Sequence, residues 1–363
     1  MTDKKYPINT GEVEAEYQEL AAQMNWPDSL YLPRIFKKAF SLEQAGLALE
    51  FPISPDEIGS ILGISVEEVE GNAQQRQVEA IALKLGLEQY TVENHIRYMF
   101  ELGYAFPTRR GWRWARDILQ LRDSQTNRKF DEQLGDEYFD LWKAFERVEM
   151  YPATSPSAET EPGFRIIPSR KSLADTADIL PQESVEQILK RAATVAVVHC
   201  PCKRMVRDRD PDMPTEVCII CDKVAEHNIR RGTARVISLE EALAIHDSAT
   251  AAGLVCMPQS TEAWPKAVCH CHRSSCGVLT PAVLMNYPFQ TTIIPSPYKA
   301  RTDTDKCTGC KKCLAVCQFG AIRMEEPAES ELTHKARVDT EKCLGCGLCV
   351  TVCPDGARTI SAD

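Results

Sequence analysis

The spacing of cysteines constrains this chain more than any other feature. The sequence holds 16 cysteines, and all of them lie between Cys200 and Cys353. Eight form two runs with the spacing C-x2-C-x2-C-x3-C, namely Cys307, Cys310, Cys313 and Cys317, then Cys343, Cys346, Cys349 and Cys353. Thiolates are the ligands that soft metal centres prefer. We therefore expect these eight cysteines to be metal ligands.

Disulfide bonds are the alternative use of an even number of cysteines, and they belong to oxidising compartments. The first residues, "MTDKKYPINTGEVEAEYQEL", contain no apolar segment of the kind found in signal peptides. No apolar run approaches the roughly 18 residues that a membrane span needs. We therefore expect a cytoplasmic protein without a membrane span, in which the cysteines bind metal.

The doubled run resembles the module of bacterial ferredoxins that holds two 4Fe–4S clusters, over about residues 300–360. The resemblance implies that one cluster is held by Cys307, Cys310, Cys313 and Cys353, and the other by Cys343, Cys346, Cys349 and Cys317. Two departures are visible: Gln318 replaces the usual proline, and a longer segment separates the two halves. Neither departure removes a ligand. Zinc is disfavoured, because C-x2-C pairs suit zinc but two complete four-cysteine runs of this kind do not.

The other eight cysteines lie in residues 164–296 and include two C-x-C pairs. The stretch "TVAVVH" predicts a buried strand that ends at Pro201, so that the thiols of Cys200 and Cys202 converge at its end. The stretch "PTEVCIICDKVAEHNIRRG" is predicted to be helical, which would turn Cys218 and Cys221 to the same side. The remaining four are Cys256, Cys269, Cys271 and Cys276.

The order C-x-C, C, G-L-V and C-x-C-x4-C ahead of a ferredoxin module resembles a group of little-characterised iron–sulfur proteins from anaerobes. In that pattern His272 and Ser275 stand where further cysteines are expected, while Cys221 and Cys256 are additions. The predicted metal ligands here are Cys200, Cys202, Cys218, Cys221, Cys269, Cys271 and Cys276. The leading interpretation is one or more additional 4Fe–4S clusters, with Cys200, Cys202, Cys218 and either Cys269 or Cys271 as ligands of a single one. A zinc site with His199, His270 or His272, a catalytic Cys218/Cys221 dithiol and plain structural thiols remain open.

Residues 1–150 lack cysteine and are predicted to be helical, with a short internal repeat. Ile58, Leu62, Gly63, Ile64, Val69 and Glu70 recur 23 residues later as Ile81, Leu85, Gly86, Leu87, Val92 and Glu93. The second copy and the hairpin "PTRRGWRWARD" resemble a winged helix-turn-helix domain of the MarR-like kind. The resemblance implies a recognition helix at residues 91–97 and a wing with Arg109, Arg110, Arg113 and Arg116. Glu93 and the net charge of −10 argue against nucleic-acid binding.

The predicted fold class is α+β multidomain. The domains are a helical, winged-helix-like domain at residues 1–150, a linker at 151–163, a small cysteine-rich α/β domain at 164–296 and a ferredoxin-like domain with two 4Fe–4S clusters at 297–363. The linker is predicted from its content of proline, serine, threonine and glutamate.

The predicted function is the relay of low-potential electrons to or from a partner oxidoreductase. The chain is expected to be an electron carrier or an oxidoreductase subunit rather than a stand-alone enzyme, and its sequence names no catalytic residue. It has no G-x-G-x-x-G, P-loop or G-x-S-x-G motif. Alternatives are a redox-sensing regulator that uses the winged helix, and an oxidoreductase subunit whose middle cluster has an open iron. The N-terminal domain would serve for docking or for homodimerisation.

Overall fold

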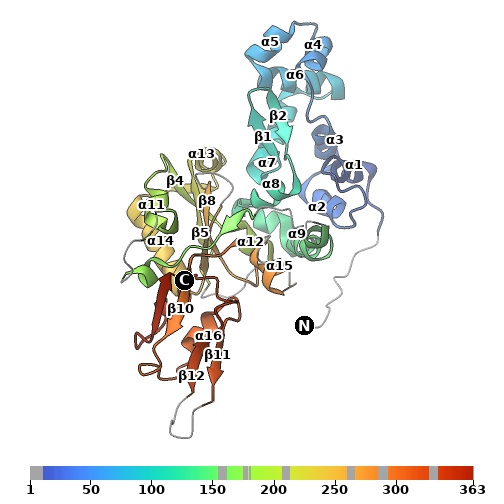
Figure 1. Ribbon diagram of the computed structural model, residues 1–363. Coiled ribbons are helices and arrows are strands. Elements are labelled where there is room, and N and C mark those ends of the chain that lie inside the picture. The colour runs from blue at the N-terminus through green and yellow to red at the C-terminus, as the bar shows by residue number, and fades with distance from the viewer. Residues whose placement is uncertain are drawn as a thin grey trace. The chain divides into compact units, whose positions relative to one another are not determined.

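The computed structural model describes residues 11–153, 162–174, 179, 181–206, 213–259, 266–284, 293–326 and 334–362 (Figure 1). The chain divides into two compact units, residues 1–153 with 204–207, and residues 154–203 with 208–363. Most of the predicted linker, residues 154–161, lies outside the described residues, and its first three residues are helical. Among the described helices, none has the length and apolar character that crossing a membrane requires.

The first unit is helical and contains one hairpin. Its elements are α1 (Ala15–Gln23), α2 (Leu32–Ala39), α3 (Leu42–Leu49), α4 (Pro55–Leu62), α5 (Val66–Gly71), α6 (Ala73–Leu85), α7 (Gln89–Leu102), β1 (Ala105–Thr108), β2 (Gly111–Trp114), α8 (Ile118–Asp123), η1 (Arg128–Phe130), α9 (Asp131–Phe145), η2 (Glu146–Met150) and α10 (Tyr151–Ala153). Its core is rich in aromatic side chains, among them the fully buried Tyr104, Tyr138 and Trp142. Figure 1 shows α4, α5 and α6 together at one end of this unit.

The 23-residue repeat is confirmed as a repeated helix end. Gly63 follows α4 and Gly86 follows α6, each with a φ of 67°. In both copies the next residue donates its N–H to a carbonyl five residues back, from Ile64 to Gly59 at 3.1 Å and from Leu87 to Ala82 at 2.9 Å. A left-handed residue is required there, which explains the glycine. The elements α6, α7 and the hairpin β1–β2 follow one another in the chain. The resemblance to a winged helix-turn-helix domain that binds DNA stays a prediction.

The second unit is built around a five-stranded antiparallel sheet, with the strand order β6-β4-β5-β8-β7. Its elements up to residue 294 are β3 (Phe164–Arg165), η3 (Arg170–Leu173), η4 (Pro181–Glu183), α11 (Val185–Leu189), β4 (Val195–His199), α12 (Pro201–Val206), β5 (Glu216–Cys221), α13 (Asp222–Arg230), β6 (Ala234–Val236), α14 (Leu239–Ala251), β7 (Val255–Pro258), β8 (Ala267–Cys271), α15 (Leu279–Leu284) and β9 (Ile293–Ile294). The predicted strand "TVAVVH" is β4, and it ends before Pro201 as expected.

The helix predicted over "PTEVCIICDKVAEHNIRRG" is wrong for its first part, because Glu216–Cys221 is the central strand β5 and the helix begins only at Asp222. Successive strand residues point to opposite faces. Cys218 therefore lies on one face of the sheet, and Cys221, three residues later, lies on the other. The run of apolar residues "VCIIC" is compatible with a buried strand or a buried helix, and periodicity does not distinguish them.

The C-terminal part of the second unit consists of two halves that repeat one another at an offset of 36 residues. Cys307 in the first half matches Cys343 in the second, and Cys317 matches Cys353. Its elements are β10 (Tyr298–Thr302), α16 (Lys312–Val316), β11 (Ile322–Glu325), β12 (Lys335–Val338), α17 (Leu348–Thr351) and β13 (Arg358–Ala362). Strand β10 pairs with β13, and β11 pairs with β12, both antiparallel. Asp303 donates its N–H to Ala357 at 2.8 Å, and Asp339 donates to Ala321 at the same distance. The two halves are thus related by approximate twofold symmetry.

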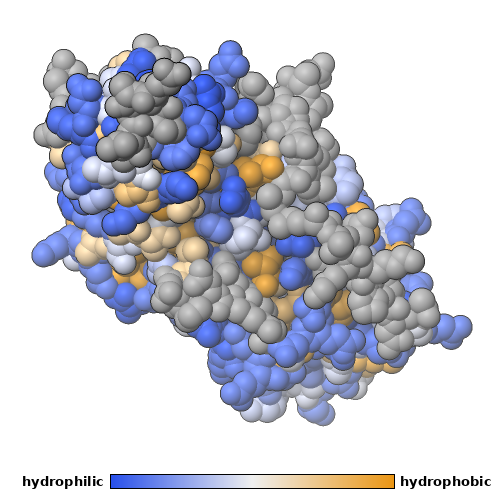
Figure 2. All heavy atoms as spheres, turned by 90° about the horizontal axis from the view of Figure 1, so that it is seen from below, coloured by the Kyte–Doolittle hydropathy of each residue, from blue (hydrophilic) through white to orange (hydrophobic). Residues whose placement is uncertain are grey.

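The outer surface is mainly hydrophilic on the face that Figure 2 shows, with hydrophobic residues in separate areas between hydrophilic ones. Large apolar side chains that are more than half exposed come from different elements, and they are Leu30, Leu83, Tyr90, Leu119 and Val236. Scattered exposure of this kind is ordinary for a folded protein.

Candidate metal centres

The first ferredoxin-type cysteine set surrounds a small cavity that opens to the surface. Its lining includes the four predicted ligands Cys307, Cys310, Cys313 and Cys353. Cys307 and Cys310 come from the loop before α16, Cys313 lies in the first turn of α16, and Cys353 comes from the other half of the repeat. Cys310 is exposed, whereas Cys313 is buried. The cavity therefore brings together the set that the ferredoxin resemblance implies, with one edge at the surface.

The second set lies at the symmetric position and is more enclosed. Cys343 and Cys349 are buried. Burial raises the pKa of Cys346 well above its usual value, and the nearby thiols of Cys349, Cys317 and Cys343 contribute to this shift. All four members of the set are thus within electrostatic reach of one another. Cys317 also accepts a hydrogen bond from the Ala321 N–H, at 3.3 Å, which helps to hold its sulfur in place.

Each half also has a lysine that crosses to the other half. Lys335 donates to the Cys307 carbonyl at 2.9 Å, and Lys299, which lies 36 residues earlier, donates to the Cys343 carbonyl at 2.7 Å. These lysines place equal charges beside the two sets.

A third set contains six of the middle cysteines, whose thiols form a closed ring of hydrogen-bonded neighbours. In ring order they are Cys200, Cys218, Cys269, Cys271, Cys276 and Cys202, which returns to Cys200. We call this set the thiol ring. Cys218, Cys269 and Cys271 share one face of the sheet, and Cys200 and Cys202 stand where β4 ends and α12 begins. Strand β4 ends at His199, and Pro201 starts α12 between the two thiols, so that neither is held in the regular alternation of a strand.

Four members of the thiol ring, Cys200, Cys218, Cys271 and Cys276, are buried, and Cys202 and Cys269 are partly buried. Hydrogen bonds from the thiols of Cys218 and Cys271 hold the pKa of Cys269 well below its usual value. Neighbouring thiols and burial raise the pKa of Cys200 and of Cys276. A buried ring of thiols cannot ionise throughout unless cations are bound to it. The donor set therefore suits a thiolate-bound metal centre.

Two buried polar groups beside the thiol ring support this interpretation. Lys203 is 2% exposed, and its Nζ has no hydrogen-bond partner among the described residues. The backbone N–H of Lys203 donates to the Cys200 sulfur, so the backbone of Lys203 is in contact with the thiol ring. Ser275, next to Cys276, is 1% exposed, and its hydroxyl likewise lacks a partner in the described part of the chain. A buried ammonium needs an anion nearby, and a thiolate-ligated iron–sulfur cluster would provide negative charge.

Two of the eight middle cysteines lie apart from the thiol ring. Cys221 and Cys256 belong to the apolar cluster on the opposite face of the sheet, against α11 and α14. Burial raises the pKa of Cys221 to about 12, and the nearby Asp222 adds to the effect. The structure therefore does not bring Cys221 to the other predicted ligands, because a separation of three residues on a strand reverses the side-chain direction. The predicted Cys218/Cys221 dithiol is excluded by the same geometry.

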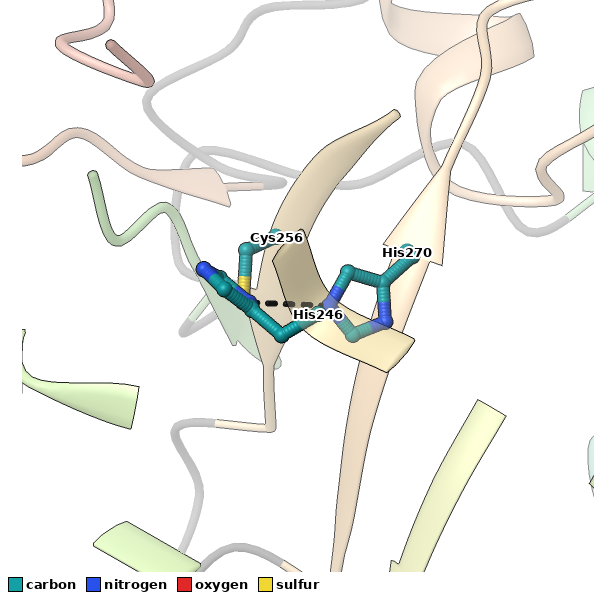
Figure 3. Close-up of side chains that lie close together, drawn as sticks. All are labelled: His246, Cys256 and His270. Carbon is teal, nitrogen blue, oxygen red and sulfur yellow. Dashed lines mark hydrogen bonds between the residues drawn. The ribbon is translucent and has the colours of Figure 1, made fainter. Parts of the chain in front are cut away.

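On this opposite face His246, Cys256 and His270 place donor atoms within 4.8 Å of one another (Figure 3). His270 Nδ1 lies 2.7 Å from the Val217 carbonyl, which only accepts, so this nitrogen carries the proton. His270 Nε2 then accepts from His246 Nδ1 at 3.0 Å. His246 Nε2 in turn accepts from the Arg170 N–H at 3.3 Å.

Both rings are therefore neutral and fully hydrogen-bonded, and burial lowers the pKa of each. A metal between the rings would displace the His246 Nδ1 proton to Nε2, where it would face the Arg170 N–H. The pair is complete without a metal. His246 was missed from sequence, although its place on the buried stripe of α14 with Ala242, Ala249 and Thr250 marks it as a core residue.

Gln318, which replaces the expected proline, joins the second cysteine set to the thiol ring. Its Nε2 donates to the Gly253 carbonyl at 2.8 Å, and its Oε1 accepts from the Arg273 N–H at 3.0 Å. Gln318 is 3% exposed and follows Cys317, while Arg273 lies in the loop between Cys271 and Cys276. The departure from the ferredoxin pattern thus serves the contact with the cysteine-rich sheet.

We expect Gln318→Ala to lower the free energy of unfolding by about 2–3 kcal/mol, because it leaves the buried Gly253 carbonyl and the partly buried Arg273 N–H without a partner. The measurement is anaerobic urea unfolding of the metal-loaded protein. Pro354 occupies the matching position 36 residues later and makes neither contact, so Pro354→Ala is the control and should cost less. Equal losses for the two variants would contradict this role of Gln318.

The wing arginines are partly engaged within the helical unit. Arg113 donates to Gln120 Oε1 at 3.1 Å and lies over the Phe106 ring. Arg116 pairs with Asp117 at 2.8 Å. In the predicted recognition helix, Arg97 donates to Asn94 at 2.6 Å. Phosphate binding would have to compete with these contacts, which weakens the DNA-binding interpretation.

Comparison with known proteins gives one family match. Residues 306–357 match the model of a 4Fe-4S dicluster domain. The match covers all eight cysteines of the doubled run, from Cys307 to Cys353. Searches of curated proteins and of solved structures found no significant match to the chain. The match and the clustered cysteines together support a ferredoxin-like iron–sulfur module with 4Fe–4S clusters at the C-terminal end of this chain.

Proposed function

We propose that this protein is an iron–sulfur electron-transfer protein that relays low-potential electrons between two partner sites. The ferredoxin-like module would hold two 4Fe–4S clusters, one on Cys307, Cys310, Cys313 and Cys353, and one on Cys343, Cys346, Cys349 and Cys317. A further cluster would occupy the thiol ring. Each cluster, when bound, takes up and releases one electron with little change in geometry.

The observation that carries this proposal is the sequence of contacts between the three cysteine sets. Cys307 and Cys313 of the first set pack in one apolar cluster with Cys343 and Cys349 of the second. Cys346 of the second set packs in the next apolar cluster with Cys271 and Cys276 of the thiol ring, as does Leu348 of α17. The first set reaches the surface at Cys310, and the thiol ring is buried at the other end. Such an order favours a path for electrons from the surface to the interior of the unit.

The chain's own residues would prepare these sites for reduction. Apolar side chains such as Leu344 and Leu348 exclude water from the second set. The N–H groups of Val278 and Leu279 point at the Cys276 sulfur, at 3.4 and 3.5 Å, and would stabilise negative charge there. Lys203 would compensate the charge of a cluster in the ring.

The test is anaerobic purification followed by measurement of iron, acid-labile sulfide and zinc per chain. Three 4Fe–4S clusters predict about twelve irons and as many sulfides, all reducible by dithionite. About eight irons would contradict the further cluster, and one zinc beside them would make the thiol ring a structural zinc site. Absence of iron would contradict the whole proposal.

The partner is expected to be a redox protein or an oxidoreductase complex that exchanges electrons at the exposed edge near Cys310. The helical unit would provide docking or homodimerisation. Its engaged wing arginines favour this role over a DNA-reading regulator.

A further inference from the structure

The two ferredoxin-type sets differ in one buried charge, although their backbones repeat. Arg358, at the start of β13, is 3% exposed and lines the cavity of the first set. Its Nη1 donates to Thr302 Oγ1, while Nε and Nη2 have no partner among the described residues. A buried guanidinium with two unused N–H groups requires an anionic neighbour. The cavity that it lines is the place where a thiolate-bound cluster would provide one.

The matching position in the other half holds an apolar residue. Ile322, 36 residues before Arg358, is also buried. The preceding alanines, Ala321 and Ala357, accept the equivalent hydrogen bonds from Asp339 and Asp303. The backbone is thus the same at the two positions, and only the charge differs.

Other charges beside the two sets change this contrast little. Lys299 and Lys335 occupy equivalent places and affect both sets alike. Asp355 also lines the first cavity and accepts from Thr308 at 2.7 Å, but it is exposed and therefore screened by solvent. Lys311, which stands opposite Gly347 in the repeat, adds a further positive charge to the first cavity.

We propose that Arg358 makes the cluster on Cys307, Cys310, Cys313 and Cys353 the more easily reduced of the two. Reduction from the 2+ to the 1+ state adds one electron, taken from a one-electron donor protein, and hence one negative charge. A buried cation in contact with the cluster stabilises that charge more than an apolar side chain does. The electron would therefore rest at the surface-facing cluster, and the second cluster would lie at lower potential between it and the thiol ring. This inference rests on the proposed function.

The guanidinium also acts on the second set. Burial raises the pKa of Cys349 to about 12, and Arg358 opposes that shift. Because Arg358 lines the first cavity directly, its effect is expected to be larger there. Removal of the Arg358 guanidinium should therefore lower the midpoint potentials of both clusters in the ferredoxin-like module. The higher of these two potentials should fall by more.

The experiment is an anaerobic potentiometric titration of the full chain, with dithionite as reductant, followed by electron paramagnetic resonance. Arg358→Ile installs the residue of the matching position, Arg358→Lys keeps the charge, and Arg358→Gln replaces it by a neutral hydrogen-bonding group. We expect Arg358→Ile to lower the higher of the two midpoint potentials of the ferredoxin-like module by at least 59 mV, which corresponds to a tenfold change for a one-electron couple. The lower midpoint should fall by less, and Arg358→Lys should retain most of the wild-type value.

Iron and sulfide are measured on every variant, so that loss of a cluster is distinguished from a change in its potential. If Arg358→Ile fails to assemble, Arg358→Gln decides the outcome. Fully loaded neutral variants with unchanged midpoints, or with a larger fall of the lower midpoint, would overturn the assignment. A wild-type chain without iron in the ferredoxin-like module would instead overturn the proposed function.

Discussion

Replacing Cys200, Cys202 and Cys218 together by serine is expected to remove about four irons per chain. The variant leaves three thiols in the ring, one fewer than a cubane cluster uses. Serine preserves the size of each side chain but replaces the soft sulfur ligand by oxygen. The measurement is iron and sulfide per chain after anaerobic purification.

The matched control uses the two cysteines on the other face of the sheet. Cys221 and Cys256 are at least as buried as the ring members and belong to the apolar cluster on that face, where Cys256 also lies beside His246 and His270. Cys221→Ala with Cys256→Ala should keep the full iron content and cost about 1–2 kcal/mol of stability, through lost packing. The eight irons expected in the ferredoxin-like module serve as an internal reference in both variants. Equal iron content in the triple-serine variant and in the wild type would show that the ring holds no cluster.

Gly347→Ala is expected to lower the free energy of unfolding by about 3 kcal/mol, through backbone strain and a steric clash. Gly347 has a φ of 73°, which costs other L residues about 1–2 kcal/mol. A Cβ on it would also lie 2.1 Å from Ser172 Oγ and 2.7 Å from Ser172 Cβ. The loop between Cys346 and Cys349 would have to move away from η3, whose neighbour Ser169 donates its N–H to the Cys346 carbonyl at 3.0 Å.

The repeat supplies the control for this prediction. Lys311 occupies the matching position with a φ of 63° and carries a full side chain, which is exposed. Lys311→Gly relieves the backbone but gains freedom in the unfolded chain, so its net effect should stay within about 1 kcal/mol. Adding Ser172→Gly to Gly347→Ala should recover the steric part of the loss and leave the backbone part. Anaerobic urea unfolding of the metal-loaded chains measures all four proteins, and an absence of recovery would contradict the steric explanation.

The environment for charge differs between the three cysteine sets of the second unit. The first cysteine set has an exposed edge and a buried cation, while the second is enclosed by apolar side chains. Solvent access and nearby charge are the main influences of a protein on iron–sulfur potentials. The three sites are therefore expected to differ in potential even where their ligands are identical.

Much of this arrangement was predictable from the sequence because it depends on short-range spacing. The C-x2-C-x2-C-x3-C runs confine their cysteines to one loop and one helix start, whatever surrounds them. The same holds for the glycines at 63 and 86, which the repeat marks and which end two helices in the same way. The strand end at Pro201 followed from the chemistry of proline alone.

Only the tertiary structure decided which middle cysteines lie together. The run "VCIIC" is apolar throughout, so its pattern did not reveal that β5 is a strand, and the mistaken helix placed Cys221 beside Cys218. Pairing of β5 with β4 and β8 sorts the thiols by face, and that pairing joins residues about 20 to 50 positions apart. In the sequence Gln318 was visible only as a departure from the ferredoxin pattern, and Arg358 was not singled out. Their roles depend on burial against distant segments, which local patterns do not record. The sequence by itself thus determined the ligand spacing and the helix ends, while long-range packing decided the membership of the thiol ring and the charge beside each cysteine set.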